Sequence, residues 1–402
     1  PTILFPSGLT TTVTYDYAKG LPLSETDPNG AVTSATYDAF GRFTGLTRPS
    51  DTSQSLTVAY QNSPFVVTLN QKIDATHTFT VTRSYDGLGR QTLTNTNGVL
   101  VSSTFNAYGQ PVTQTTPHTS AEAFFNTTTA YEALGRPDLV TAPDGTQTDY
   151  SYYGLETWVK DAKNHTTKTL TDVWGRAKLV TPPTGPVVSF TYDAFGNLLT
   201  ATRGGAIMTL TYDRAGRKLT MSDPDMGNWS YVYDALGNMT RQTDARACAT
   251  NLAYDALNRP TGKTYSNCPS TPSVTYTYDA GTNGKGRRTS MGVTGGDYTS
   301  WTYDNRGRVL SENKQIPGGG QFITAFTYNL ADLPVTMKYP VDNEVVTFSY
   351  NNNMLPVSVN GTSAYAQTIA YDSAMRMIQL VRGANTLNTT YTYYPWNQQG
   401  GR

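Results

Sequence analysis

Hydrophobic and polar residues alternate one by one through short stretches along the whole chain. Val188, Phe190 and Tyr192 share one side of such a stretch, and the residues between them are polar. The stretches that end at Tyr233 and Tyr278 follow the same pattern. A period of two in Val, Thr, Tyr, Phe and Trp is typical of a β-strand with one apolar face. The chain is therefore predicted to consist of short strands.

Most of these predicted strands end in a six-residue phrase, Tyr-Asp-x-x-Gly-Arg or a close variant. When the Tyr or its replacement is taken as the mark, the copies begin at positions 15, 37, 60, 85, 105, 131, 152, 171, 192, 212, 233, 254, 278, 303, 328, 350, 371 and 393. The copy at Tyr278 carries an insertion before its Gly-Arg. A regular period of about 21 residues indicates a repeat architecture.

Each phrase has the composition of a tight turn. The Asp can accept hydrogen bonds from backbone N–H groups just ahead of it, and the Gly can adopt a positive φ without steric cost. Asn258, which replaces the Gly in one copy, is the next most tolerant residue at positive φ. The apolar residue before the Gly, such as Phe40 or Leu88, is expected to fold back onto the hairpin, and the Arg or Asn after the Gly to start the return strand.

The predicted structural turn residues come from six copies of the phrase. They are Tyr37, Asp38, Gly41, Arg42, Tyr85, Asp86, Gly89, Arg90, Tyr192, Asp193, Gly196, Tyr212, Asp213, Gly216, Arg217, Tyr233, Asp234, Gly237, Tyr303, Asp304, Gly307 and Arg308. The glycines of these copies and Gly135 are expected at positive φ.

The other end of each repeat carries Pro and Gly turn signals, as in Asp27-Pro28-Asn29-Gly30. One repeat is therefore a β-hairpin, and the fold class is all-β: about 18 antiparallel hairpins of ~21 residues in one continuous spiralling sheet. A sheet that wide must coil because strands twist, so a hollow is expected on one side. No composition shift interrupts residues 1–402, which are read as a single shell segment of a longer protein whose targeting signal lies outside.

Charge and composition exclude several classes of function. Lys and Arg together number 30, as do Asp and Glu, so nucleic acid is not an expected partner. No apolar run approaches the length of a membrane span. The histidines His77, His118 and His165 are scattered and are expected at the surface or in loops. With one carboxylate per repeat and no nucleophile constellation, the sequence predicts no metal, no cofactor and no catalytic residue, and therefore not an enzyme.

The two cysteines, Cys248 and Cys268, lie on either side of one turn phrase. Their midpoint is Asn258, and residues equidistant from a hairpin turn face each other with Cα atoms about 4.5–5.5 Å apart. That separation suits a disulfide, so we predict a Cys248–Cys268 bridge and an oxidising, extracellular setting. The alternative is two unrelated free thiols, which a bulge that turns the side chains apart would produce.

The repeated Tyr-Asp-x-x-Gly-Arg phrase, in phase over essentially the whole chain, resembles the YD-repeat or RHS-repeat family. The resemblance implies a long β-sheet that spirals into a hollow shell, as in the BC components of bacterial toxin complexes, RHS polymorphic toxins, wall-associated proteins and teneurins. In the toxins the shell encloses a C-terminal effector. Self-cleavage in that family belongs to a separate core near an Asp-Pro-x-Gly motif. Here Asp27–Gly30 matches that motif but lies among N-terminal repeats as an ordinary turn, so self-cleavage is not expected.

The resulting prediction is a non-enzymatic β-shell scaffold of a secreted or surface protein that encapsulates or protects a polypeptide. Its expected partner is an enclosed polypeptide cargo or another segment of the same protein. The alternative is an extracellular structural, fibre or adhesin protein, whose partner would be a cell-surface molecule or a glycan bound by exposed aromatic residues. The two readings predict the same sheet and differ in what its faces contact.

Overall fold

The computed structural model describes residues 2–4, 8–383 and 386–398, and these residues form strands, turns and bends without any helix. By their contacts they divide into two compact units. Unit 1 is built from Pro1–Asn126 together with Tyr276–Trp396, and unit 2 from Thr127–Thr275. More than half of the chain lies in strands.

The first eleven strands belong to unit 1: β1 (Thr2–Leu4), β2 (Thr10–Asp16), β3 (Leu21–Thr26), β4 (Val32–Tyr37), β5 (Phe43–Thr47), β6 (Leu56–Asn62), β7 (Phe65–Lys72), β8 (Thr78–Tyr85), β9 (Gln91–Thr96), β10 (Val99–Phe105) and β11 (Pro111–Thr115). Unit 2 holds the next fourteen: β12 (Asn126–Tyr131), β13 (Pro137–Thr141), β14 (Gln147–Tyr153), β15 (Glu156–Lys160), β16 (Thr166–Thr171), β17 (Ala177–Thr181), β18 (Val188–Tyr192), β19 (Leu198–Arg203), β20 (Ala206–Tyr212), β21 (Lys218–Asp223), β22 (Gly227–Tyr233), β23 (Met239–Thr243), β24 (Ala249–Tyr254) and β25 (Pro260–Ser266).

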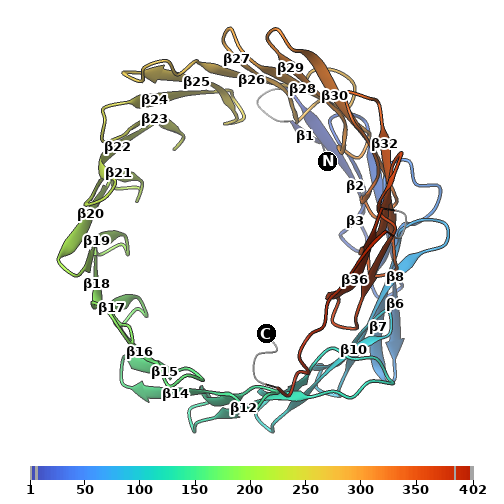
Figure 1. Cartoon of the computed structure of the whole chain (residues 1–402), viewed down its shortest axis with the longest axis vertical. Helices are drawn as coiled ribbons and strands as arrows, with labels where there is room; N and C mark the ends of the chain where they lie inside the picture. Colours follow the sequence, from blue (N-terminus) through green and yellow to red (C-terminus); the bar gives the residue numbers. More distant parts are fainter. Residues whose placement is uncertain (1, 5–7, 384–385, 399–402) are drawn as a thin grey trace. The chain divides into compact units, whose positions relative to one another are not determined.

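The remaining strands begin at the boundary between the units and complete unit 1: β26 (Val274–Tyr278), β27 (Arg288–Val293), β28 (Tyr298–Tyr303), β29 (Val309–Ile316), β30 (Gly320–Tyr328), β31 (Pro334–Lys338), β32 (Val345–Tyr350), β33 (Pro356–Asn360), β34 (Ala364–Ala366), β35 (Thr368–Tyr371), β36 (Met377–Arg382) and β37 (Leu387–Thr390). In Figure 1 the strands of unit 2 follow one another in the order of the sequence, from green to yellow.

The strands pair as the repeat predicts, each antiparallel to its neighbour in the sequence, as β18 is to β19 and β22 to β23. Thirty-four strands belong to one sheet, and β35, β36 and β37 form a separate one. The predicted continuity is therefore interrupted after β34. This strand is only three residues long, and the next backbone N–H, that of Gln367, bonds to the carbonyl oxygen of Val381 in β36 instead.

The predicted alternation between the two faces of a strand is present in the structure. In β22 the side chains of Trp229, Tyr231 and Tyr233 are half-buried, and the intervening Asn228, Ser230 and Val232 are exposed. The half-buried side is the face on which large side chains of neighbouring strands lie against each other. The other face is open to water, which explains why the strands are rich in Thr and Ser.

Unit 1 and unit 2 differ in how much they bury. Among the described residues, the buried apolar side chains are Ile73, Val81, Ala249, Val346, Ala366 and Val381, and all except Ala249 lie in unit 1. Only unit 1 brings together segments from the two ends of the chain, shown in blue and in orange to red in Figure 1. A single layer of hairpins cannot cover its own apolar face, so burial is concentrated where a second segment packs beside the first.

The hairpins have two different ends. From β2 to β33 the Tyr-Asp turns connect even-numbered strands to the odd-numbered strands that follow them, as between β20 and β21, and this side is called the Tyr-Asp end. After β34 the parity changes, so that the turn at Tyr371 connects β35 to β36. The Pro and Gly turns connect odd-numbered to even-numbered strands, as between β3 and β4, and form the Pro-Gly end. Because successive strands are antiparallel, all turns of one kind within a unit lie along the same edge of the sheet.

Candidate functional site

The Tyr-Asp turn is built around its carboxylate, as the turn after Tyr212 shows. One carboxylate oxygen of Asp213 accepts the backbone N–H groups of Ala215 and Arg217, each at 2.9 Å. The other accepts Nε–H of the Arg217 guanidinium at 2.6 Å. The carboxylate thus holds the turn through three hydrogen bonds, two of which are the Asx-type bonds expected from the sequence.

The glycine of the phrase has the conformation that the sequence suggests. The predicted glycines all have positive φ: Gly41 at 78°, Gly89 at 78°, Gly135 at 81°, Gly196 at 94°, Gly216 at 76°, Gly237 at 91° and Gly307 at 83°. Asn258 takes the same place with φ 60°. The backbone N–H of Gly216 bonds to the carbonyl oxygen of Asp213, which closes the turn.

This conformation gives a testable consequence at Gly89. A Cβ atom added there would meet no atom within 4 Å, so only backbone strain opposes a larger residue. We expect Gly89→Val to lower the free energy of unfolding by about 1–2 kcal/mol, as measured by chemical denaturation. Gly87, two residues earlier in the same turn, is equally open but lacks the positive φ. If Gly87→Val lowers the free energy of unfolding as much as Gly89→Val does, backbone strain at positive φ is not the cause.

The residue after the glycine does not start the return strand, contrary to the sequence-based expectation. The return strand begins one residue later, at Phe43 in β5 and at Lys218 in β21. A register shift just before the Tyr, between Thr211 and Tyr212 in β20, accommodates the longer loop. Arg217 therefore stays in the loop, where its side chain reaches back to the Asp.

Neighbouring repeats are joined by the Arg and the Tyr of the phrase. The guanidinium of Arg217 lies over the ring of Tyr233 in the next repeat, with Cζ 5.1 Å from the ring centre, and that of Arg176 lies over Tyr192 at 4.7 Å. The Tyr hydroxyl donates back to the preceding repeat: Tyr233 Oη–H bonds to the carbonyl oxygen of Lys218 at 3.0 Å. The contacts between neighbouring repeats are thus formed by Arg together with Tyr.

Comparison of the copies could have revealed the Asp–Arg pair, because no copy that has Asn in place of the Asp keeps Arg as the sixth residue. Where Asn replaces the Arg, as at Asn197, its side-chain amide still bonds to Asp193 at 2.8 Å. Where the second residue is Asn329 or Asn351, the sixth is Leu and the charged pair is lost on both sides. This covariation between repeats is the signal that the sequence reasoning missed.

In most of the turns the apolar residue before the glycine does not fold back onto the hairpin, whereas Leu257, before Asn258, is half-buried. In seven turns it projects into solvent, with exposed fractions from 74% at Leu236 to 90% at Tyr108. These seven residues, called here the apolar tips, are Phe40, Leu88, Tyr108, Leu134, Trp174, Phe195 and Leu236. The hydrogen bonds of the Asp already fix the loop, so no apolar contact is needed to close it.

The carboxylates of the phrase are poorly suited to catalysis. The backbone N–H of Arg217, ahead of the opposing effect of burial, lowers the pKa of the Asp213 carboxyl below its ordinary value. The backbone N–H of Arg90 does the same to the pKa of Asp86. A carboxylate kept ionised and occupied by several donors is a weak base with few free lone pairs. Within the described ranges, no three His, Cys, Asp or Glu side chains gather in a way that could hold a metal ion.

The three histidines have structural contacts. His77 and His165 lie in exposed turns, where their Nδ1 atoms are 2.9 Å from Asp74 and 3.3 Å from Asp161. His118 lies in the loop between β11 and β12, which is one of the two expected places, but it is buried there, with 8% of its surface exposed. Its Nδ1 bonds to the carbonyl oxygen of Thr116 at 2.8 Å, and its backbone pairs with Leu100, which draws the ring under the neighbouring segment.

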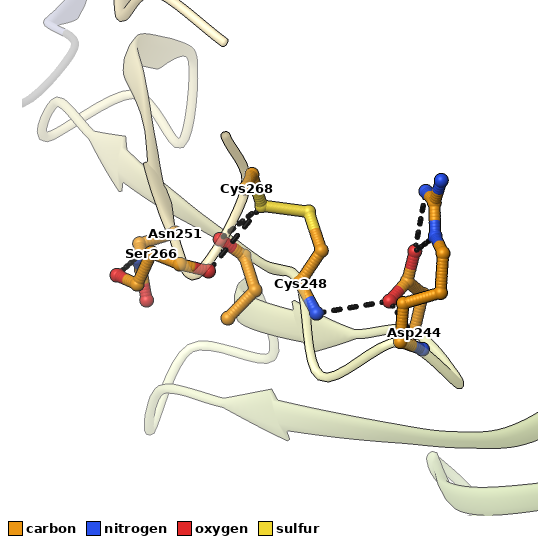
Figure 2. Close-up of a disulfide and its surroundings, with 7 residues drawn as sticks. Asp244, Cys248, Asn251, Ser266 and Cys268 are labelled. Carbon is orange, nitrogen blue, oxygen red and sulfur yellow. Dashed lines mark hydrogen bonds and ion pairs between the residues drawn. A yellow bond between two sulfur atoms is a disulfide. The ribbon is translucent and has the colours of Figure 1, made fainter. Parts of the chain in front are cut away.

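The two cysteines, Cys248 and Cys268, are bonded in the structure, with their Cα atoms 4.8 Å apart (Figure 2). They do not face each other within the ladder as the midpoint argument assumed. The bulge near Tyr254 shifts the register so that Ala249 pairs with Ser266, which would set Cys248 opposite Asn267. Asn267 adopts a positive φ of 58°, and this local turn of the backbone brings the next residue, Cys268, back to its partner.

Within unit 1, Tyr-Asp turns of late repeats contact Pro-Gly turns of early repeats, and this line of contacts is called the seam. Lys285 N–H donates to the side-chain oxygen of Asn29 at 2.9 Å, and the Asn29 amide donates back to the Lys285 carbonyl at 3.1 Å. The Asn97 amide donates to the side chain of Asn353 at 2.7 Å. These partners are 256 residues apart in the sequence, so the seam joins hairpins about twelve repeats apart.

Arg306 is the centre of the seam. Its side chain is 7% exposed and forms an ion pair with Asp51, whose side chain is 1% exposed. The same guanidinium donates to the carbonyl oxygens of Pro49 at 3.0 Å and Leu330 at 3.2 Å, and to Asp332 at 3.1 Å. A buried guanidinium with this number of acceptors fixes the relative position of the two segments.

Comparison with known proteins agrees with the fold. No curated protein matches the sequence. The solved structure of TcdB2-TccC3 is similar over 99% of this chain with a TM-score of 0.84 and 15% identity, and the complex TcdB2-TccC3-Cdc42 over 99% with a TM-score of 0.84 and 14% identity. The Tc holotoxin pore of Photorhabdus luminescens is similar over 98% of this chain, with a TM-score of 0.84 and 13% identity. This chain covers only 26%, 28% and 28% of those chains, about a quarter of their length.

A family model provides the assignment at the level of the sequence. The model described as the teneurin YD-shell matches residues 6–311, which is well over half of the chain. The described residues contain no helix that is long and apolar enough to cross a membrane. Together with the Tyr-Asp turns and the antiparallel hairpins, the match shows that this chain belongs to the teneurin YD-shell family.

Proposed function

We propose that this chain is part of the wall of a β-shell that encloses and protects a polypeptide, and that it is not an enzyme. The seam carries the proposal. In unit 1 the Tyr-Asp turns of late repeats lie on the Pro-Gly turns of early ones, after an interval of 255 residues between Asp51 and Arg306. A series of hairpins whose late repeats contact its early repeats is the arrangement that a spiral β-shell requires.

The chemistry of the turns supports a scaffold. The phrase carboxylates hold their own loops together, and the Arg and Tyr side chains connect one repeat to the next, so these polar groups serve the wall itself. Family membership supports the same role. The bonded cysteines support a secreted or surface location, because disulfides persist in oxidising compartments. The cargo would be another part of a longer protein or a separate polypeptide.

Small-angle X-ray scattering of the chain in solution tests the wall, at a concentration where single chains dominate. A compact globule of 402 residues would have a radius of gyration of about 21 Å. A hollow wall is expected to give a clearly larger value, with the most frequent interatomic distance beyond half of the maximum. A value near that of a globule would contradict the proposal. A profile peaked at short distances with a long tail would favour the fibre reading instead.

A further inference from the structure

The seam depends on asparagines that are followed directly by glycine. The sequence contains four such Asn-Gly pairs, which begin at Asn29, Asn97, Asn283 and Asn360. Asn29 and Asn97 bond across the seam, to Lys285 and to Asn353. Asparagine is a chemically labile residue, and it is most labile before glycine, which has no Cβ atom to shield its backbone nitrogen from the preceding side chain.

The reaction of an Asn-Gly pair needs water and no enzyme. The glycine nitrogen attacks the side-chain Cγ of the asparagine, and a C–N bond forms. The proton of the glycine N–H and the side-chain NH₂ group leave as ammonia, and a five-membered succinimide remains. Water then adds to one of its two carbonyl groups and opens the ring, which gives aspartate or isoaspartate. Both products carry a negative charge where the asparagine was neutral, so the reaction changes the local electrostatics.

In the closed seam, the reacting groups at Asn29 are occupied. Its side-chain oxygen accepts the N–H of Lys285 at 2.9 Å, and its amide donates to the Lys285 carbonyl oxygen at 3.1 Å and to the Asp27 carboxylate at 3.2 Å. The N–H of Gly30 donates to the carbonyl oxygen of Asp27. The Asn29 side chain must leave Lys285 before its Cγ can reach the Gly30 nitrogen. The reaction at Asn29 therefore requires the seam to open locally.

Asn97 is held in the same way, whereas Asn360 is not. The Asn97 side-chain oxygen accepts the N–H of Thr80 at 2.9 Å, and its amide donates to the Asn352 carbonyl oxygen at 2.8 Å and to the side chain of Asn353 at 2.7 Å. Asn360, at the end of β33, is exposed, and within the described part of the chain no hydrogen bond holds its side chain. The same molecule thus provides an unprotected Asn-Gly pair as an internal reference.

The product of the reaction does not fit the closed seam. A carboxylate oxygen in place of the Asn29 amide nitrogen would face the Lys285 carbonyl oxygen and the Asp27 carboxylate. In place of the Asn97 amide nitrogen, it would face the Asn352 carbonyl oxygen. Two acceptors without a proton between them form no hydrogen bond, and two carboxylates repel each other. A seam that has opened and reacted is therefore hindered from closing again.

We propose that Asn29 and Asn97 are deamidation sites that make opening of the seam irreversible. The seam protects both residues while it is closed, and their reaction while it is open keeps it open. This adds a slow, one-way opening to the proposed wall. The inference depends on the contacts of the seam and not on whether the wall encloses a polypeptide.

Peptide mapping by mass spectrometry of the whole chain, sampled over time at mildly alkaline pH, tests the protection. We expect Asn360 to react first in the folded protein. Asn29 and Asn97 should react at least about tenfold more slowly than in the chain unfolded in urea, because the folded reaction is limited by the population of open seam. Equal rates at Asn29 and Asn97 in the folded and unfolded chains would overturn the proposal.

Two destabilised variants separate opening of the seam from unfolding of the chain. Asp51 lines the same hollow as Asn29, so Asp51→Ala should speed the reaction at Asn29. Cys248→Ser with Cys268→Ser loses its cross-link in unit 2 and should leave the rate at Asn29 unchanged. The rate at Asn360 should be the same in both variants. Equal acceleration at Asn29 in the two variants would mean that it reacts from the unfolded chain, against the proposal.

The effect of the product is tested with aspartate in place of the two asparagines. The N–H of Leu330 bonds to the carbonyl oxygen of Ile73 across the seam, so its hydrogen exchange reports opening. Asn29→Asp with Asn97→Asp should exchange faster at Leu330 than the wild type, and the control Asn360→Asp should not. Exchange at the wild-type rate in the seam variant would contradict the irreversible opening. None of these results bears on the hollow wall, which scattering tests separately.

Discussion

Replacement of Asp51 by Ala should be among the most damaging single substitutions in this chain, with a loss in the free energy of unfolding on the order of 3 kcal/mol. The Asp51 side chain is 1% exposed and pairs with Arg306, which is 7% exposed. Without the carboxylate, a buried guanidinium keeps its charge and loses its closest acceptor. Asp332 and two backbone carbonyls still accept hydrogen bonds from Arg306. The expected loss in the free energy of unfolding is therefore at the lower end of the range for removal of one member of a buried ion pair.

A surface ion pair in unit 2 provides the matched control. Asp149 lies 4.0 Å from Lys160 and its side chain is 48% exposed, so Asp149→Ala should cost less than about 1 kcal/mol. Unfolding midpoints in denaturant would compare the two variants. Hydrogen exchange adds a local measure, because the backbone N–H of Leu330 bonds to the carbonyl oxygen of Ile73 across the seam. Faster exchange at Leu330 is expected in the Asp51 variant and not in the Asp149 variant.

The double variant Asp51→Leu with Arg306→Met tests whether the lost stability comes from the unpaired charge of Arg306 or from the lost packing between the two segments. A buried ion pair replaced by apolar residues of similar size often costs little, whereas removal of one member leaves a charge without compensation. The double variant should therefore be more stable than Asp51→Ala alone. Equal or greater destabilisation in the double variant would mean that the packing of the two segments depends on the charges themselves.

The sequence predicted the local features of this protein well, because they depend on residues close together in the chain. Period-two alternation, a carboxylate ahead of backbone N–H groups and a glycine at positive φ are all decided within one hairpin. The single replacement of the phrase glycine by Asn258 was enough to indicate a positive φ at that position. The repeat period then indicated that the same hairpin recurs along the chain, and this recurrence predicted the fold class.

The features that the sequence did not predict depend on residues far apart. Nothing near Arg306 indicates that its partner is Asp51, 255 residues earlier, and both resemble ordinary turn residues. The apolar tips were misjudged for a related reason: a large apolar residue in a turn was expected to be covered by its own hairpin, although the Asp had already closed the loop. The burial of His118 likewise depends on a bridge to Leu100 in another hairpin.

The second large effect is expected at the pair of cysteines. Their separation is 20 residues, and a cross-link that closes such a loop restricts the unfolded chain by about 3 kcal/mol in the chain-entropy model. Cys248→Ser with Cys268→Ser should lower the free energy of unfolding by about that amount. Ala249, the neighbour of Cys248, is fully buried and Asp244 accepts the Cys248 N–H at 2.9 Å, so these local contacts should survive and confine the loss to the cross-link.

Thiol alkylation of the native protein, without reductant, checks the bond itself. A bonded pair gives no alkylated cysteine until reductant is added. The bond closes just outside the ladder: Cys248 lies one residue before β24 and Cys268 two residues after β25, and Asn267 turns the chain between β25 and Cys268. Asn267→Gly, which also tolerates positive φ, should keep the thiols protected, whereas Asn267→Val should slow or prevent formation of the bond because a β-branched residue resists that conformation. Two reactive thiols in the native wild-type protein would contradict the bridge and remove the main support for an oxidising compartment.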